Sequence, residues 1–304
     1  MGYAVETTKL TKKFGAVTAV RDLDLRISTG EVFGFLGPNG SGKSTTIKIL
    51  LDEVRATSGT AQLLGLDSHD DLVELHRRIG YLPGELRLPA DLTGGEYLDF
   101  LAGLRSTSDE KHRRELLERF DLDPTRRLRH LSTGNKQKVG LVQAFMHRPE
   151  LVLLDEPTTG LDPLVQHDFH EMLRAEAEQG MTVLLSSHAL SEVDQVADQV
   201  GVIRRGALVA VERVDVLKAQ ARRQLNLEFA ASVPRGVLES APGVYSVEYA
   251  EKSATIRFEG DVDALLRTAV AVGHLVSVRT PEIDLEEVFL GFYRDAPPDL
   301  GQTP

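Results

Sequence analysis

The spacing of apolar residues changes along the chain and separates two predicted domains. Up to about residue 218, short apolar runs alternate with helical patterns, which is typical of an α/β fold with parallel strands and crossover helices. Runs at 31–37, 151–156 and 181–188 lack period-two alternation and predict buried strands. Apolar spacings of three and four predict a helical subdomain at about 84–147. The first domain is therefore expected to span 1–218.

Beyond residue 218, apolar and polar positions alternate, which predicts short half-buried strands. The alternation is clearest at 225–229 and 254–258, and a helix is predicted at 261–272. Residues 219–295 are therefore expected to form a small α+β domain, followed by a flexible Pro-rich tail at 296–304. A closing helix is predicted from the spacing of Leu285, Val288, Phe289 and Phe292.

Composition narrows the classes of function. The 304 residues are 41% apolar and 27% charged, as in ordinary globular proteins. A formal net charge of −11 disfavours a nucleic-acid binder, because phosphate contacts need clustered Lys and Arg. The chain has no Cys, which excludes a disulfide framework and a thiolate metal site. No stretch approaches the roughly 18 apolar residues of a membrane span, so we expect membrane attachment through a partner.

A glycine-rich segment carries the strongest chemical signal. The phosphate-loop pattern, GxxxxGK followed by Ser or Thr, is matched by residues 37–44 (GPNGSGKS), between a predicted strand and a predicted helix at 45–51. There the glycines let consecutive backbone N–H groups face an anion. Lys43 would reach the β and γ phosphates, and the Ser44 hydroxyl would bind Mg²⁺. The alternative, a turn that only caps a helix, does not explain this Lys and Ser.

Three polar residues end the other two predicted strands. Asp155 can orient a Mg²⁺ shell, and the adjacent Glu156 can polarise a water molecule. The alternative for this pair is an acidic strand end that caps the following helix. His188 could contact a γ phosphate, or it could be structural, and the residue alone leaves both open.

Residues 131–137 (LSTGNKQ) resemble the LSGGQ signature of the ATP-binding cassette (ABC) ATPases. They lie between the phosphate loop and the LLDEP segment, as in that family, and TTGLDP and SSH follow in the family's order. Five ordered motifs along residues 4 to about 218 carry the resemblance. It implies a P-loop NTPase fold of the ABC type that binds and hydrolyses ATP with Mg²⁺.

The resemblance also implies individual roles within one chain. Glu156 would be the general base, and His188 would sense the γ phosphate. Phe14 would stack on adenine, where many members have Tyr. Mg²⁺ would be bound by Ser44 and Asp155. The residues that would hold the phosphates are Gly37, Pro38, Asn39, Gly40, Ser41, Gly42, Lys43, Ser44 and Thr45.

Other implied roles need a second copy of the chain. Ser132 and Gly134 would complete the opposite subunit's site, and Asp162 would link the two sites. One chain has one of each motif, so the phosphate loop of one copy is expected to face the signature of another. A twofold pair would then hold two equivalent ATP sites. The other expected partner is a separate transmembrane permease, which would hold the pair at the cytoplasmic face of the cell membrane.

The C-terminal part resembles the small accessory domain of many bacterial drug and antibiotic exporter ATPases of the ABC-2 type. This resemblance implies a ferredoxin-like fold and export of drug-like or hydrophobic compounds. A cluster of acids is expected to be a solvated face rather than a metal site. Its members are Glu282, Asp284, Glu286 and Glu287.

Two competing functions belong to other classes. Soluble ABC ATPases act on ribosomes, chromosomes or cofactor assembly, but the ribosome factors usually carry two cassettes and the chromosome proteins a long heptad coil. A regulatory module would bind ATP without hydrolysing it, and such modules often lack the base found here at Glu156.

The chain departs from the family's pattern in two places. Gly84 stands where members usually have a Gln that contacts Mg²⁺ and couples to the membrane subunit, and Glu85 follows it. Glu85 either substitutes for that Gln or is a solvated loop carboxylate. In the signature, Thr133 and Asn135 replace Gly and Gln, while the Ser and Gly needed for anion contact remain.

Overall fold

The protein is described by a computed structural model that covers residues 2–105, 109–220 and 223–280. By its internal contacts the chain divides after Val214 into two compact units, here called the cassette unit and the C-terminal unit. The predicted closing helix, the acidic cluster from Glu282 to Glu287 and the predicted tail lie outside the described residues. None of the described helices combines the length and apolar composition that a bilayer crossing needs.

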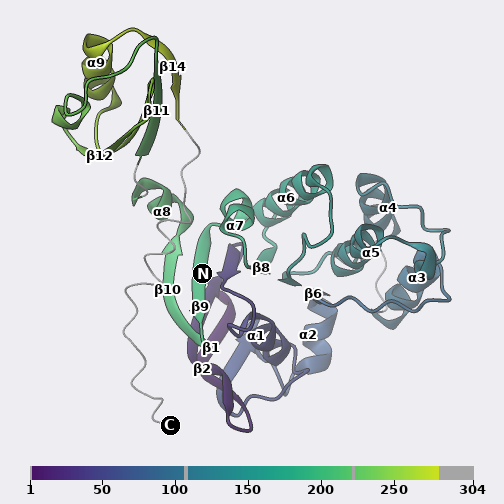
Figure 1. The fold of residues 1–304 in the computed structure, drawn as a ribbon. Helices are drawn as coiled ribbons and strands as arrows, with labels where there is room; N and C mark the ends of the chain where they lie inside the picture. The colour runs from purple at the N-terminus through teal and green to yellow at the C-terminus, as the bar shows by residue number, and fades with distance from the viewer. Residues whose placement is uncertain (1, 106–108, 221–222, 281–304) are drawn as a thin grey trace. The chain divides into compact units, whose positions relative to one another are not determined.

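A six-stranded sheet forms the centre of the cassette unit (Figure 1). Its strand order is β10-β9-β3-β8-β7-β6, and all neighbours are parallel except β9 and β10. Three of the strands are buried along their whole length and confirm the three strands predicted from apolar runs. The strands are β3 (Val32–Leu36), β6 (Ile79–Leu82), β7 (Leu151–Asp155), β8 (Thr182–Ser187), β9 (Gln199–Arg204) and β10 (Ala207–Arg213).

A second, antiparallel sheet was not predicted from the sequence. It joins strands in the order β2-β1-β4-β5, and register shifts interrupt the β1 pairings. The two sheets share one apolar core, to which the phosphate-loop helix contributes Ile47 and Leu50. Its strands are β1 (Tyr3–Phe14), β2 (Val17–Ser28), β4 (Ser58–Leu63) and β5 (Leu66–Asp67).

Helices of the cassette unit cover the sheet and build the predicted insert. The helix predicted after the phosphate loop is α1 (Lys43–Leu50). The insert contains α3, α4, a 3-10 turn and α5, and Figure 1 shows these three helices grouped at one end of the unit. The insert elements are α3 (Gly94–Arg105), α4 (Glu110–Arg119), the turn Leu128–His130 and α5 (Thr133–Phe145). The other helices are α2 (Leu72–Arg78), α6 (Pro163–Glu178) and α7 (Leu190–Val196).

Hydrogen bonds of polar side chains connect the helical insert to the six-stranded sheet. Arg105 of α3 donates through Nη1 to Nδ1 of His147, at 2.7 Å. The other ring nitrogen, Nε2, lies 3.1 Å from the carbonyl oxygen of Ile79 in β6. These partners fit a neutral imidazole that accepts at Nδ1 and donates at Nε2. Burial, and then the neighbouring guanidinium, lower the pKa of His147 to about 4.

The C-terminal unit is a small α+β structure. Its four antiparallel strands have the order β12-β13-β11-β14, and one face packs on α9. Leu225, Leu227 and Phe229 are buried in its core, which confirms the predicted alternation. Its elements are α8 (Val214–Gln220), β11 (Arg223–Phe229), the turn Leu238–Ser240, β12 (Val244–Tyr249), β13 (Ser253–Phe258), α9 (Val262–Val272) and β14 (Leu275–Arg279).

The lowered pKa of His147 predicts a loss of stability in mild acid. Between about pH 6.5 and about pH 4 the unfolded chain binds a proton that the folded chain does not, so the free energy of unfolding falls as pH falls through this window. The expected contribution is up to about 3 kcal/mol. His147→Gln keeps an acceptor for Arg105 and a donor for Ile79 but does not titrate.

Urea unfolding of the full chain at pH 7 and pH 4.5 measures this effect. The wild type should lose more stability than His147→Gln over the same interval, although carboxylates titrate in both proteins. Equal losses in the two proteins would contradict the expectation.

Candidate functional site

The phosphate loop leaves β3 and enters α1 through a backbone that excludes side chains. Gly42 has φ of 116°, a conformation open mainly to glycine. A Cβ on Gly42 would lie 2.6 Å from the carbonyl oxygen of Ala19, and a Cβ on Gly37 would lie 2.4 Å from that of Ile203. The glycines therefore allow a close approach of backbone to backbone. Inside the loop, the Ser41 hydroxyl oxygen is buried and has no hydrogen-bond partner in the described structure.

Lys43 lies beneath this loop with only 5% of its side chain exposed. Its Nζ donates to the carbonyl oxygens of Gly37, at 2.5 Å, and Pro38, at 3.4 Å. It also lies 3.5 Å from Oε1 of Glu156. A buried ammonium needs several acceptors, and here the loop and the end of β7 supply them together.

The end of β7 presents two carboxylates that are held differently. Asp155 is buried, and its Oδ1 accepts a hydrogen bond of 2.6 Å from the Ser186 hydroxyl on β8. Glu156 has φ of 51°, an unusual value for a residue with a side chain, and its N–H donates to Ser186 Oγ at 3.1 Å. Ser186 therefore holds both residues; it lies in the SSH motif, but the sequence analysis assigned it no role.

His188 follows β8 and contacts Glu156 directly. Its Nδ1 lies 2.5 Å from Oε2 of Glu156, while the other oxygen of that carboxylate faces Lys43. The imidazole is 56% exposed and the Glu156 side chain 20% exposed. Glu156 is thus positioned between a buried cation and a solvent-facing imidazole, which suits a base that must reach water.

Lys43, the two carboxylates and His188 line one open cleft of about 990 Å³. Tyr81 also lines it, and burial raises the pKa of this phenol well above its usual range, with Glu53 and Asp155 adding to the shift. The cleft gathers most of the site residues predicted within one chain. They are Asn39, Gly40, Ser41, Gly42, Lys43, Ser44, Thr45, Asp155, Glu156 and His188.

Phe14 lies outside the lining of this cleft. It ends β1, is 50% exposed, and carries the Lys12 ammonium 4.8 Å from its ring centroid. The ring is therefore in contact with a cation, and half of the side chain remains exposed.

The signature residues also lie outside the cleft. Ser132 caps α5 by accepting a hydrogen bond from the Asn135 N–H, and Asp162 caps α6 by accepting one from the Val165 N–H. A Cβ on Gly134 would lie 2.7 Å from the carbonyl oxygen of Gly160. The signature turn and the loop before α6 are therefore packed backbone to backbone.

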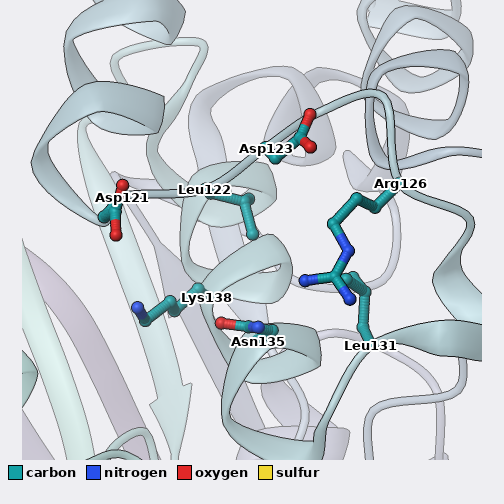
Figure 2. Close-up of a pocket in the computed structure, with 7 residues that line it drawn as sticks. All are labelled: Asp121, Leu122, Asp123, Arg126, Leu131, Asn135 and Lys138. Carbon is teal, nitrogen blue, oxygen red and sulfur yellow. The ribbon is translucent and has the colours of Figure 1, made fainter.

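A separate pocket of about 310 Å³ borders the signature helix. Figure 2 shows Arg126, on the loop before the signature, facing Asn135 on α5. Lys138, Asp121 and Asp123 complete its charged lining. Two cationic and two anionic side chains together do not select a charged ligand.

Comparisons with known proteins agree with this geometry. The sequence profile described as ABC transporter matches residues 20–159. The bacitracin transport ATP-binding protein BcrA of Enterococcus faecalis is 33% identical over 299 residues, which cover 95% of this chain and 96% of the relative. The chain belongs to the ATP-binding subunits of ABC transporters. It is therefore an ATPase whose hydrolysis of ATP powers transport.

Further comparisons concern a second relative and the fold. The daunorubicin/doxorubicin resistance ATP-binding protein DrrA of Streptomyces peucetius is 37% identical over 221 residues, covering 71% of this chain and 67% of the relative. An ATP-binding cassette solved as a dimer in a post-hydrolysis state, with ADP and Pi bound, has a TM-score of 0.64 at 24% identity. That likeness covers 69% of this chain and 98% of the other. The cassette unit therefore has the fold of an ABC nucleotide-binding domain.

The departure at Gly84 has a clear structural setting in this ABC subunit. A Cβ at Gly84 would lie 3.0 Å from Oδ2 of Asp155. Glu85 also lines the cleft, but its carboxylate is 87% exposed and lies 3.4 Å from Nη2 of Arg87. This geometry favours the solvated alternative for Glu85.

The contact at Gly84 predicts that Gly84→Ala perturbs Asp155. Ser186 holds the Asp155 carboxylate on its other side, so the new methyl group should displace it and lower the ATPase rate by about tenfold. Glu85→Ala, one residue away, should leave the rate unchanged. Steady-state ATP hydrolysis by the two purified variants measures both effects. Loss of activity in Glu85→Ala instead would place that carboxylate in the site.

Proposed function

We propose that this chain powers the export of antibiotic-like or other hydrophobic compounds. The names of two relatives, which refer to bacitracin transport and to daunorubicin resistance, support this substrate class. The observation that carries the catalytic part is the convergence of Lys43, Glu156 and His188 in one cleft. The cargo itself would be selected by the membrane subunit.

Within the cleft, the roles follow from chemistry and position. The loop from Gly37 to Thr45 holds the phosphates through its N–H groups, and the orphaned Ser41 hydroxyl offers a buried donor. Glu156 accepts the proton of the attacking water, because its carboxylate reaches the open cleft. His188 contacts Glu156 and senses the γ phosphate. Phe14 stacks on the adenine.

Mg²⁺ fits the donors at this site. Ser44 and Asp155 offer the oxygen ligands that this cation prefers, and Mg²⁺ usually takes few protein ligands beside phosphates and water. Oδ2 of Asp155 faces Gly84, where no side chain intervenes. When bound, the ion would neutralise charge on the β and γ phosphates.

The working form is a pair of identical chains. Ser132, Gly134 and Asp162 lie outside the cleft that holds their own phosphate loop, so one copy has an incomplete site. In a twofold pair each copy supplies its signature to the other's nucleotide. ATP then joins the two copies, and hydrolysis removes the shared contact.

The pair acts on a separate transmembrane permease at the cytoplasmic face of the membrane. Residues 219–295, within the C-terminal unit, are assigned to an accessory domain with ferredoxin-like topology, and the strand order β12-β13-β11-β14 with antiparallel neighbours in its described part supports that topology. Its task is to stabilise the pair or to regulate it.

Glu156→Gln should lower the turnover number by at least about 100-fold while ATP binding and ATP-dependent pairing persist. The substitution removes the base but keeps the size of the side chain. Lys43→Ala provides the contrast, because it removes the buried ammonium and should weaken ATP binding itself. ATPase assays, fluorescent-nucleotide titration and size-exclusion chromatography separate these outcomes. Undiminished turnover in Glu156→Gln would remove the assignment of the base.

The transport role predicts a hydrophobic partner. Full-length chain expressed in its own cells with an affinity tag should co-purify from detergent-solubilised membranes with a polytopic protein, and that protein should change the ATPase rate. Lys43→Ala should still co-purify, since it affects nucleotide binding. A chain recovered entirely without such a partner would favour a soluble ABC ATPase.

A further inference from the structure

Glu192 bridges two catalytic segments from outside the cleft. It lies on α7, one turn after His188, and its side chain is partly buried. Oε1 accepts a hydrogen bond of 2.6 Å from the Thr158 hydroxyl, and Oε2 accepts one of 2.6 Å from the Ser187 hydroxyl. We call these two hydrogen bonds the Glu192 bridge.

The two hydroxyls belong to the segments that carry the base and the imidazole. Thr158 follows Glu156 by two residues, and Ser187 directly precedes His188. Both donors are almost fully buried, Thr158 at 4% and Ser187 at 0% exposure. The carboxylate therefore fixes the spacing of two backbone segments whose side chains meet at the Glu156–His188 contact.

We infer that Glu192 is a positioning residue for ATP hydrolysis, which holds Glu156 and His188 in register by bridging Thr158 and Ser187. The inference rests on the roles proposed for Glu156 and His188. Glu192 does not line the cleft, so it acts through these residues and not on the nucleotide. Its loss should therefore affect turnover more than nucleotide affinity.

A carboxylate suits this task better than other side chains. It offers two acceptor oxygens in one plane, and both bridge partners donate. A Gln side chain has the same size as Glu and keeps one acceptor oxygen. Its amide group can donate to the other hydroxyl, because a hydroxyl oxygen can also accept a hydrogen bond. An Ala leaves the Thr158 hydroxyl without the acceptor it has in the described structure. Turnover is therefore expected to be highest with Glu at position 192, lower with Gln and lowest with Ala.

Other contacts should keep the variants folded. The turn around Thr158 is also held by Gln137 of α5, whose Nε2 donates to the Pro157 carbonyl at 3.0 Å. Gln166 of α6 donates to the Leu161 carbonyl at 3.1 Å. Ser187 retains its contacts with the backbone of Ala189. Loss of Glu192 therefore loosens the spacing of the segments without removing their other attachments.

The test compares Glu192→Ala, Glu192→Gln and a charge-matched control, Glu178→Ala, which removes an exposed carboxylate from the neighbouring helix α6. In the full chain with Mg²⁺ and ATP, Glu192→Ala should lower kcat by about 10- to 100-fold with KM changed by less than about threefold. Glu192→Gln should recover much of the loss. Glu178→Ala should match the wild type.

A second comparison checks the route of action. Thr158→Val removes one bridge hydroxyl, and its effect on kcat should not add to that of Glu192→Ala, because both variants break the same hydrogen bond. Additive effects, an unchanged kcat in Glu192→Ala, or a loss carried by KM alone would overturn the inference. If Glu156→Gln abolishes turnover while Glu192→Ala does not, only the positioning role fails. If Glu156→Gln retains turnover, the proposed roles in the cleft fail first.

Discussion

The buried ammonium of Lys43 is the interaction on which the cassette unit depends. A charge with 5% exposure is stable only where acceptors surround it. The carbonyls of Gly37 and Pro38 supply part of that shell, and the Glu156 carboxylate completes it. The loop, helix α1 and the end of β7 are thereby fixed around one charge. The contact between Lys43 and Glu156 therefore ties the end of β7 to the loop that the proposed function assigns to the phosphates.

Two backbone conformations with positive φ make this arrangement possible. Gly42 has φ of 116°, and Glu156 has φ of 51° although it carries a side chain. Conformations of this kind persist where the surroundings hold them. For Glu156, the holding contacts are the hydrogen bonds from its N–H to the backbone oxygen and hydroxyl of Ser186. The unusual backbone conformation of Glu156 and the hydrogen bonds that hold it therefore lie together at the end of β7.

The sequence alone was sufficient to predict the parts of the site that follow the parallel strands. Strands β3, β7 and β8 are apolar throughout, and their carboxyl ends meet at one edge, so residues that follow them had to come together. The antiparallel sheet escaped prediction because register shifts break the alternation of β1. The roles of Ser186 and Glu192 were missed for a different reason, although Ser186 lies in the SSH motif. Their importance lies in hydrogen bonds between segments distant in sequence, which no local pattern encodes.

At Gly84 there is no side chain that could connect the helical insert to the cleft. Asp155 faces the backbone at Gly84, the position at which the family resemblance implies a Gln. Besides the contact of Arg105 with His147, the insert reaches the sheet through Gln143 of α5. Gln143 accepts a hydrogen bond of 2.6 Å from the Tyr97 hydroxyl and donates one of 3.5 Å to the Tyr81 carbonyl. Strand β6, which carries Tyr81, pairs in parallel with β7, which ends at Asp155. Hydrogen bonds and strand pairing therefore connect α3 and α5 through β6 to the strand that ends at Asp155.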